Sequence, residues 1–321
     1  MLRSIVLGLI ITAILLTMSC GKDNPTITPT SGPNLIFKFK FDSTQARLDG
    51  FGNPSTMTMG HSGQNPQFNV MGAHYIELDS LSTTIFGTGA ILYNAATIGA
   101  GSPPPIDFSK EVQSKEGETF FSIPLKNVTP GVFQYLRISL AYQNYDVKYR
   151  IDTAYPVAHG LIPGDTFPVH QDFPCTVASF IGYNTYITNF LIKTQTIPVN
   201  ASKPQGFWGY ETQVNLGAYY NQTLTQTGQA AGTTVVNPLH FTSPIPLNSC
   251  VVTGQFLKSG QTTPSNLTIT GNETQDVVVT VSLSTNKSFE YTDPNHNGKW
   301  EPLKGEVVTD MGIRGMIPIV Q

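Results

Sequence analysis

The feature that most limits how this chain can fold is a short alternation of apolar and polar residues that recurs along it. In LIFKFKFD, Leu35, Phe37 and Phe39 fall on one side of an extended chain, and the two lysines fall on the other. A period of two residues is typical of a β-strand with one buried face. Segments that favour β-strands lie at residues 35–42, 67–78, 118–125, 132–143, 147–152, 178–199, 205–214, 249–257 and 276–285.

Clusters of turn-forming residues separate these segments, for example NVTPG at 127–131 and TGNE at 270–273. Only STQARLDG, at 43–50, has the look of a helical turn, so helical crossovers between strands are not expected. No repeat of fixed length is visible, which disfavours a propeller or a solenoid. The sequence therefore predicts an all-β fold, an antiparallel β-sandwich of an immunoglobulin-like or jelly-roll related type.

The amino-terminal segment has the features of an export signal. Arg3 precedes an uncharged apolar run from Ile5 to Met18, which is too short to span a bilayer as a helix but suits a signal peptide. The run ends at Ser19-Cys20, which resembles the lipobox of bacterial lipoproteins, with Thr17 where leucine is commonest. The resemblance implies cleavage before Cys20 and acylation of that residue, with chains such as palmitate anchoring the protein to a membrane. The alternative is an ordinary secreted protein whose Cys20 survives near the cut.

The predicted domain organisation follows from this signal. Residues 1–19 are the lipoprotein signal peptide, and residues 20–33, with three prolines and no apolar period, are a flexible tether. Residues 34–321 form the β-sandwich, as one domain or as two sub-modules dividing near 155–175. Lys22-Asp23 resembles surface-export signals of Bacteroidota lipoproteins. The predicted location is the cell envelope, as an outer membrane lipoprotein that faces the periplasm or the surface.

Charge limits the choice of partners. Without Arg3, 17 basic residues face 21 acidic ones, a formal charge of −4, and charged residues are only 12% of the chain. Since no basic stripe is present, nucleic acid is not an expected partner. The expected partners are the membrane, through the lipid anchor, and an unidentified envelope protein or glycan.

Two cysteines remain if Cys20 is lipidated. Cys175 and Cys250 form an even pair in an exported protein, which predicts a disulfide between them. Two buried free thiols are the alternative. Neither cysteine has a neighbouring histidine and acid in a protease pattern, so neither is expected to be a nucleophile.

The strongest candidate site is the stretch DPNHNGKWEPLKGE at residues 293–306. Asp293, Asn295 and Asn297 stand at positions one, three and five of a calcium-binding loop, and Gly298 stands at the sixth position, where such loops turn sharply. The Lys299 carbonyl is the expected ligand at position seven. The full predicted ligand set is Asp293, Asn295, Asn297, Lys299, Glu301 and Glu306.

The second half of this loop departs from the usual spacing. Lys304 occupies position twelve, where a bidentate glutamate is expected, so Glu306 is the closing ligand only if Leu303-Lys304 is a two-residue insertion. With that insertion the stretch resembles the D-x-N-x-N-G-x-W-D-x-G-E loops of exported bacterial β proteins. Asn297-Gly298 between two strands is also a strong signal for a plain hairpin. The sequence favours a structural calcium site and leaves the hairpin as the alternative.

Three segments resemble the MbnP-like family, periplasmic or surface proteins of the methanobactin-partner type. They are FSIPLKNVTPGVFQYLRISLAYQNYD at 121–146, QGFWGYE at 205–211 and DVVVTVSLSTNKSF at 276–289. They occur in the family's order, although AYQNYD stands where the family has GVD. The resemblance implies a β-sandwich and, in some members, copper held in part by histidines.

The histidines give copper little support from spacing alone. They lie at residues 61, 74, 159, 170, 240 and 296, and none forms an H-x-H or H-x3-H pair. His170 and Asp172 share a face if that segment is a strand, and a copper site assembled from distant strands stays open. Copper is therefore the alternative metal.

Signatures of catalysis are weak. The pair Glu116 and Glu118 suggests the two carboxylates of a glycosidase, but alternating acids on a strand are usually solvated. Tyr142, Tyr145 and Tyr149 have the spacing of sugar-stacking residues, or of residues that pack a sheet. The predicted function is a lipid-anchored, calcium-braced binding or structural module without catalysis. A copper-binding protein of the MbnP-like type is the alternative, and a glycan-active enzyme is the third possibility.

Overall fold

A computed structural model describes residues 32–156, 166–217, 220–234, 236–237 and 249–321 of the chain. The predicted all-β fold is confirmed, because these residues form β-strands and three short 3-10 helices and contain no α-helix. No helix in these ranges is long and apolar enough to cross a membrane. The predicted signal peptide (1–19), the acylation site Cys20 and nearly all of the predicted tether (20–33) lie outside the described residues.

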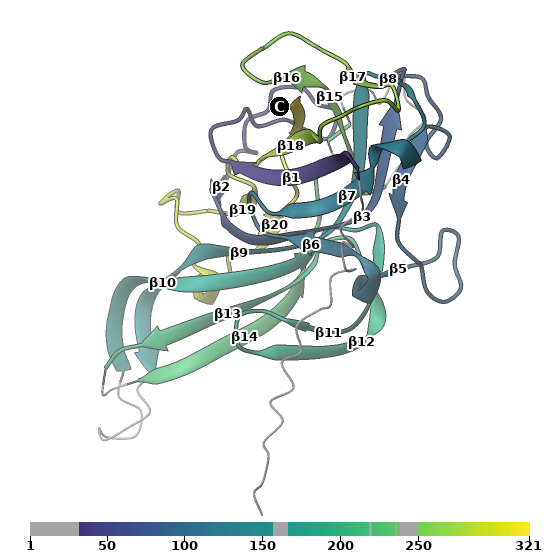
Figure 1. The fold of residues 1–321 in the computed structure, drawn as a ribbon. Helices are drawn as coiled ribbons and strands as arrows, with labels where there is room; N and C mark the ends of the chain where they lie inside the picture. Colours follow the sequence, from purple (N-terminus) through teal and green to yellow (C-terminus); the bar gives the residue numbers. More distant parts are fainter. Residues whose placement is uncertain (1–31, 157–165, 218–219, 235, 238–248) are drawn as a thin grey trace, which may run out of the picture.

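One layer is a five-stranded sheet that joins the two ends of the described chain. Its strands lie in the order β16 (Leu257–Lys258), β21 (Met316–Val320), β18 (Val277–Ser284), β1 (Asn34–Asp42) and β7 (Thr119–Pro124). The first strand, β1, runs antiparallel to β7 and parallel to β18, with Leu35 opposite Val277. Figure 1 shows β1, β7 and β18 stacked in the upper half of the molecule.

The second layer is an eight-stranded sheet that continues into the lower half of the molecule (Figure 1). Its main path is β14 (Asn221–Gln229), β13 (Phe207–Asn215), β10 (Thr166–Phe180), β9 (Tyr135–Pro156), β3 (Gln67–Asp79) and β4 (Ala90–Asn94). Two further strands, β15 (Val251–Gln255) and β6 (Val112–Ser114), pair with β9 and β3. Strands β9 and β10 pair along their described residues, with Tyr142 opposite Phe180 at one end and Pro156 opposite Thr166 at the other.

Three small sheets complete the fold. They are β12 (Thr196–Pro204) with β11 (Asn184–Leu191) and β5 (Ile106–Asp107), β17 (Leu267–Ile269) with β8 (Gly131–Phe133), and β2 (His61–Gln64) with β19 (Phe289–Thr292) and β20 (Val308–Asp310). The 3-10 helices are η1 (Phe108–Lys110), η2 (Leu125–Asn127) and η3 (Pro302–Lys304). Most strand pairs are antiparallel as predicted, and β1–β18, β16–β21 and β5–β11 are parallel. These parallel pairs need no helical crossover because their partners are far apart in sequence or joined by other strands.

The main core lies between the two large sheets. The alternation that predicted the first strand is confirmed, since Leu35, Phe37 and Phe39 are at most 1% exposed. They pack with apolar residues of β3, β9 and β18, and the Phe39 ring stacks on Phe120 with 3.8 Å between centroids. Burial of each side chain of this size contributes about 1.5–3 kcal/mol to folding.

A second core forms on the downstream half of β9. Val147, Tyr149 and Ile151 alternate along the strand, so their side chains share one face. They pack with residues of β10 and β13, with Phe289 of β19 and with Trp300. Tyr142, Tyr145 and Tyr149 are buried in two different cores, so their rings are not available for stacking on the surface of the protein.

The predicted disulfide between Cys175 and Cys250 is wrong, because both residues are buried free thiols. Cys175 lies opposite Val147 of β9, whereas Cys250 directly precedes Val251, which lies opposite Ser139 of the same strand. Cys250 therefore lies beside Leu140, and seven residues of β9 at about 3.3 Å each separate the two positions by about 23 Å. A disulfide requires Cα atoms within about 7 Å of each other, so an even cysteine count was insufficient evidence for pairing.

His74 makes the stability of this core depend on pH. Burial lowers the pKa of His74 from 6.5 to about 4, while a hydrogen bond with the backbone of Ser139 opposes that shift. The unfolded chain therefore binds a proton between pH 6.5 and 4 that the folded chain does not bind. The stability present above pH 6.5 is lost as the pH falls toward 4, and the loss is on the order of 3 kcal/mol.

We expect the His74→Gln variant to lose clearly less stability between pH 7 and pH 4.5 than the wild type, because glutamine does not titrate. Urea unfolding at the two pH values measures this difference. Other titrating groups contribute equally to both proteins, so the comparison isolates His74. Equal losses in the two proteins would contradict the assignment.

Candidate metal centre

The predicted metal loop connects β19 to β20 and is held in place by Trp300. Trp300 is 1% exposed and lies in the second core, with its ring 4.9 Å from Phe289 and 5.5 Å from Tyr149, centroid to centroid. Its carbonyl accepts a hydrogen bond of 2.8 Å from the Arg150 backbone amide of β9. A buried indole and this backbone hydrogen bond fix the middle of the loop on the eight-stranded sheet.

Asp293 organises the first half of the loop. Its Oδ1 accepts a hydrogen bond from the Asn297 amide at 3.1 Å, and its Oδ2 accepts one from the Gly298 amide at 2.9 Å. The Ser62 hydroxyl of β2 also donates to Oδ2, at 2.6 Å. Burial raises the pKa of Asp293, but these hydrogen bonds outweigh it and leave the pKa below its usual value. The residue is therefore a buried carboxylate ion.

The chain turns sharply at the sixth position of the loop, as the sequence predicted. Gly298 has a φ of 71°, in the left-handed region that favours glycine. The side-chain oxygen of Asn295 accepts a hydrogen bond of 3.1 Å from the Asn297 amide, and that of Asn297 accepts one of 2.8 Å from the Lys299 amide. The first half of the loop thus folds around its own side-chain oxygens.

The second half of the loop adds two further carboxylates to this hydrogen-bond network. Glu301 is 1% exposed, and its Oε2 accepts hydrogen bonds from the carboxamides of Asn295 and Asn297, both at 2.7 Å. Glu306 is 6% exposed, and its Oε2 accepts a hydrogen bond of 2.5 Å from the Glu301 amide. All six predicted ligand residues are therefore joined by direct hydrogen bonds.

The two glutamates differ in their electrostatic environment. Burial raises the pKa of Glu301, but hydrogen bonds from Lys304, Asn295 and Asn297 outweigh it and lower the pKa overall. Burial raises the pKa of Glu306, and repulsion from Glu301 and Asp293 adds to the rise. Glu306 Oε1 is buried and has no hydrogen-bond partner among the described residues. The Glu301 amide and the Lys304 ammonium thus compensate the charge of this carboxylate only in part.

Lys304 lies at the exposed edge of the loop, beside Glu301. Leu303 and Lys304 are exposed within η3, which ends at Gly305 with a φ of 86°, and the chain then returns inward to Glu306. The Lys304 ammonium reaches Glu301 Oε1 at 2.9 Å and Asp152 of β9 at 3.3 Å. The sequence position that breaks the usual spacing is thus an outward-turned residue whose amine contacts one predicted ligand.

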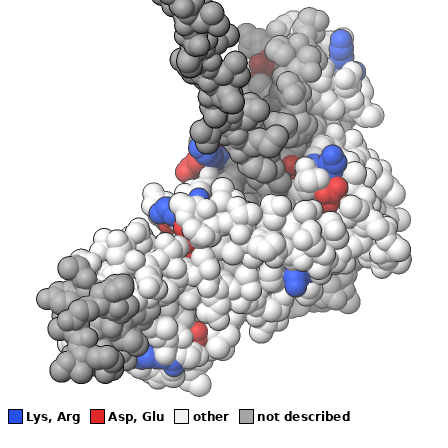
Figure 2. Space-filling view, turned by 90° about the horizontal axis from the view of Figure 1, so that it is seen from below, with Lys and Arg blue, Asp and Glu red and all other residues white. Residues whose placement is uncertain are grey.

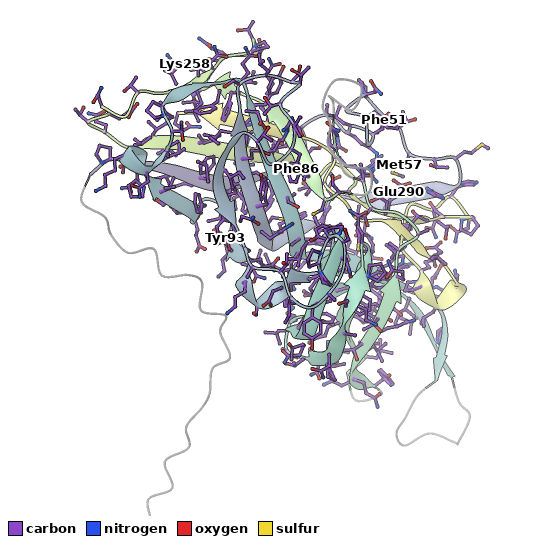
Figure 3. All side chains as sticks on the ribbon, turned by 90° about the vertical axis from the view of Figure 1, so that its right-hand side faces the viewer. Phe51, Met57, Phe86, Tyr93, Lys258 and Glu290 are labelled. Atoms are coloured by element: carbon purple, nitrogen blue, oxygen red, sulfur yellow. The ribbon has the colours of Figure 1, made fainter. Side chains whose placement is uncertain are left out.

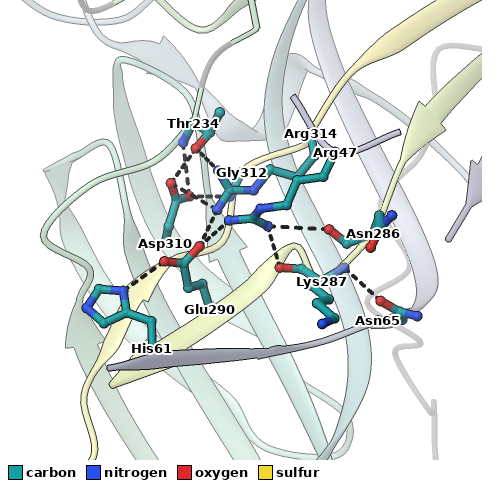
Figure 4. Close-up of polar contacts among 10 residues, drawn as sticks. All are labelled: Arg47, His61, Asn65, Thr234, Asn286, Lys287, Glu290, Asp310, Gly312 and Arg314. Carbon is teal, nitrogen blue, oxygen red and sulfur yellow. Dashed lines mark hydrogen bonds and ion pairs between the residues drawn. The ribbon is translucent and has the colours of Figure 1, made fainter. Parts of the chain in front are cut away.

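A network of charged residues beneath the loop holds β19 and β20 to the rest of the fold (Figure 4). The buried carboxylate of Glu290 in β19 pairs with Arg47, with Arg314 at 2.9 Å and with the His61 ring at 2.8 Å. Asp310 of β20 also pairs with Arg314, at 3.3 Å. Sequence reasoning missed this network, since its members are far apart in the chain and match no motif.

The described histidines do not come together. His61 contacts Glu290, His74 is buried in the sheet, the exposed His170 pairs with Asp152, and His296 lies on the predicted metal loop. His159 and His240 lie outside the described residues. Within the described part of the chain, no group of three His, Cys, Asp or Glu side chains is placed to hold a metal ion. A calcium site in this loop would therefore depend on amide and carbonyl oxygens as well as carboxylates.

Comparison with known proteins adds no relative. No family model matches the chain, and no curated protein or solved structure matches it either.

Because the charge of Glu306 is only partly compensated, we expect its removal to raise the melting temperature. In a chelating buffer at pH 7, Glu306→Gln should melt at a higher temperature than the wild type, because it removes repulsion with Asp293 and Glu301. The raised pKa means that the wild type loses stability as the pH rises through it, so the difference should shrink toward pH 4. Thermal melts at both pH values measure the effect. A variant that melts lower than the wild type at pH 7 in chelator would contradict it.

Proposed function

We propose that this chain is a lipid-anchored protein of the cell envelope, a binding or structural module without catalysis whose β19–β20 loop is braced by calcium. The observation that carries the proposal is that three buried carboxylates, Asp293, Glu301 and Glu306, belong to one short loop and are linked through its hydrogen bonds. Three like charges that are removed from water favour a divalent cation as their partner.

The chemistry of the donor set supports calcium. Calcium takes six to eight oxygen ligands, and the loop offers three carboxylates, the side-chain oxygens of Asn295 and Asn297, and the Lys299 carbonyl. The carboxamides of both asparagines now direct their nitrogens at Glu301. A half-turn of each carboxamide would present an oxygen to a cation here, in exchange for the hydrogen bonds that these oxygens now accept from the Asn297 and Lys299 amides. The unpartnered Glu306 Oε1 is a further available ligand atom.

The effect of calcium on the fold would be structural. The loop carries Trp300 into the second core, so a cation that fixes the loop also fixes the contact between β19, β20 and β9. Loops of this kind in extracellular modules bind calcium at about 10⁻⁴–10⁻³ M. Such a site would be filled outside the cytoplasm, where the signal sequence directs the chain.

Calcium should raise the melting temperature of the wild-type protein, and a chelator should lower it. Binding to the folded state alone adds about 2.7 kcal/mol of stability when calcium is a hundredfold above its dissociation constant. Asp293→Ala and Glu306→Gln should abolish the response, because each removes a charged ligand. Thermal melts over a calcium series measure it. A wild-type melting temperature that millimolar calcium does not move would reduce the loop to a plain hairpin.

Two control variants make this experiment specific. Lys304→Ala should keep the calcium response or enlarge it, because it removes an ammonium that competes for Glu301. Glu118 is an exposed acid directly before β7, and Glu118→Gln should leave the response to calcium unchanged. Loss of the response in Lys304→Ala would show that the two-residue insertion is misplaced. Metal analysis after mild dialysis tests the alternative, since retained copper without a calcium response would favour an MbnP-like copper protein.

Lipid anchoring is tested separately, through Cys20. Cys20→Ala removes the thiol that the lipobox resemblance assigns to acylation, so this variant should move from the membrane fraction to the soluble fraction. Membrane fractionation and the mass of the amino-terminal peptide measure the change. Cys175→Ala is the matched control and should stay with the membrane. Unchanged detergent partitioning of Cys20→Ala would rule out this anchor.

A further inference from the structure

A groove of about 400 Å³ lies beside the metal loop, on the side of β9. Its walls come from four parts of the chain: the β2–β3 turn with Gln64 and Asn65, β9 with Lys148 and Arg150, β10 with Asp172, and the 297–300 segment of the loop. This volume falls in the range of sites that bind small molecules. Since three of the four walls lie outside the loop, the groove is a feature of the sheet as well as of the metal centre.

The groove carries an excess of positive charge. Lys148, Arg150 and Lys299 line it with one acid, Asp172. Figure 2 shows how thinly charged residues are spread over one face of this molecule, and only 12% of the chain is charged. Three cations around one small groove are therefore a local concentration, which favours an anionic ligand.

Arg150 has capacity to bind such an anion. Its contacts to Asp152 and Asp172 are long, at 3.6 Å and 3.4 Å, and its Nε is buried without a hydrogen-bond partner among the described residues. A guanidinium offers five donors in a planar arrangement that matches the two oxygens of a carboxylate. Lys148 is exposed beside it and adds a second positive charge at the groove.

Side-chain amides supply neutral polar contacts in the same groove. The Gln64 carboxamide is fixed by two hydrogen bonds of 2.8 Å to the backbone of Lys148, one in each direction. Asn65 accepts a hydrogen bond of 2.7 Å from the Lys287 amide through its oxygen, so its NH₂ group is the donor that remains. Fixed amides beside a guanidinium suit a ligand that combines hydroxyl groups with a carboxylate.

We propose that this groove binds the uronate residues of an acidic polysaccharide. Arg150 and Lys148 would pair with the sugar carboxylate, and the amides and Lys299 would contact the hydroxyl groups. Stacking contributes little, because Trp300 is 1% exposed and Tyr145 and Tyr149 of β9 are buried. Binding should therefore be strongly weakened by salt. The dependence on calcium rests on the proposed function, since the loop forms one wall, whereas the charges on β9 do not depend on it.

Calorimetric titration of the purified full-length protein with trigalacturonate tests the proposal. We expect binding to trigalacturonate and none to neutral galactotriose at the same concentration. Lys148→Glu and Lys299→Glu should each weaken binding by about tenfold or more. Lys148→Arg keeps the positive charge and should bind like the wild type. The control Lys258→Glu should bind like the wild type, since Lys258 lies on the five-stranded sheet, far from Glu290 of the loop hairpin in Figure 3.

Several outcomes would overturn the proposal: equal binding of the neutral sugar, equal weakening by Lys258→Glu, or inorganic phosphate binding as tightly as the uronate. Free galacturonate that binds as tightly as the trimer would support the carboxylate contact and identify a free sugar acid as the ligand.

Titrations in calcium and in chelator separate this proposal from the calcium proposal. Binding that is tighter in calcium supports both, because the coupling between two ligands is reciprocal. Equal binding in both buffers supports the groove and removes the coupling, while thermal melts judge the calcium site independently. No binding in either buffer overturns the groove proposal, whatever calcium does to the melting temperature.

Discussion

The rest of the structure depends on the hydrogen-bonded pairing of one strand, β9, with three neighbours. Its first half pairs with β3 and β15 under the five-stranded sheet, and its second half pairs with β10 beneath the metal loop. The backbone of β9 also holds the loop, through the hydrogen bond from the Arg150 amide to the Trp300 carbonyl. It holds one wall of the groove through two hydrogen bonds between the Lys148 backbone and the Gln64 side chain. Core, loop and groove are therefore fixed relative to one another by a single strand.

The chain places several of its few charges inside the fold. Arg137 of β9 is fully buried, with its guanidinium 3.1 Å from Asp79 and 3.8 Å from Glu77. Burial raises the pKa of Asp79 to about 7, Arg137 opposes this, and Glu77 adds to it. Breaking such a pair leaves a buried charge uncompensated, which is why these residues specify one arrangement of β3 and β9. The Glu290 network does the same for β19 and β20.

Local pattern was enough to predict the strands, whereas distant pairing was not predictable. The alternation in residues 35–42 and 276–285 marked β1 and β18, but nothing in either segment indicates that they pair in parallel. The loop residues from Asp293 to Gly298 were recognisable because their spacing is local. The pocket for Trp300, the pairing of Lys304 with Asp152, and the groove all depend on β9, more than a hundred residues earlier. The disulfide prediction for Cys175 and Cys250 was wrong for the same reason, since an even number of cysteines carries no information about the distance between them.

The parallel pairing of β1 with β18 has a consequence for how the protein is made. Val277 lies 242 residues after its partner Leu35, so the five-stranded sheet cannot close until most of the chain has been synthesised. Closure of so long a loop is entropically costly, and folds dominated by such contacts fold slowly. Until then the phenylalanine-rich face of β1 remains exposed and prone to aggregate. A chain of this topology gains most from a chaperone that covers its first strand until the last strands are available to pair with it.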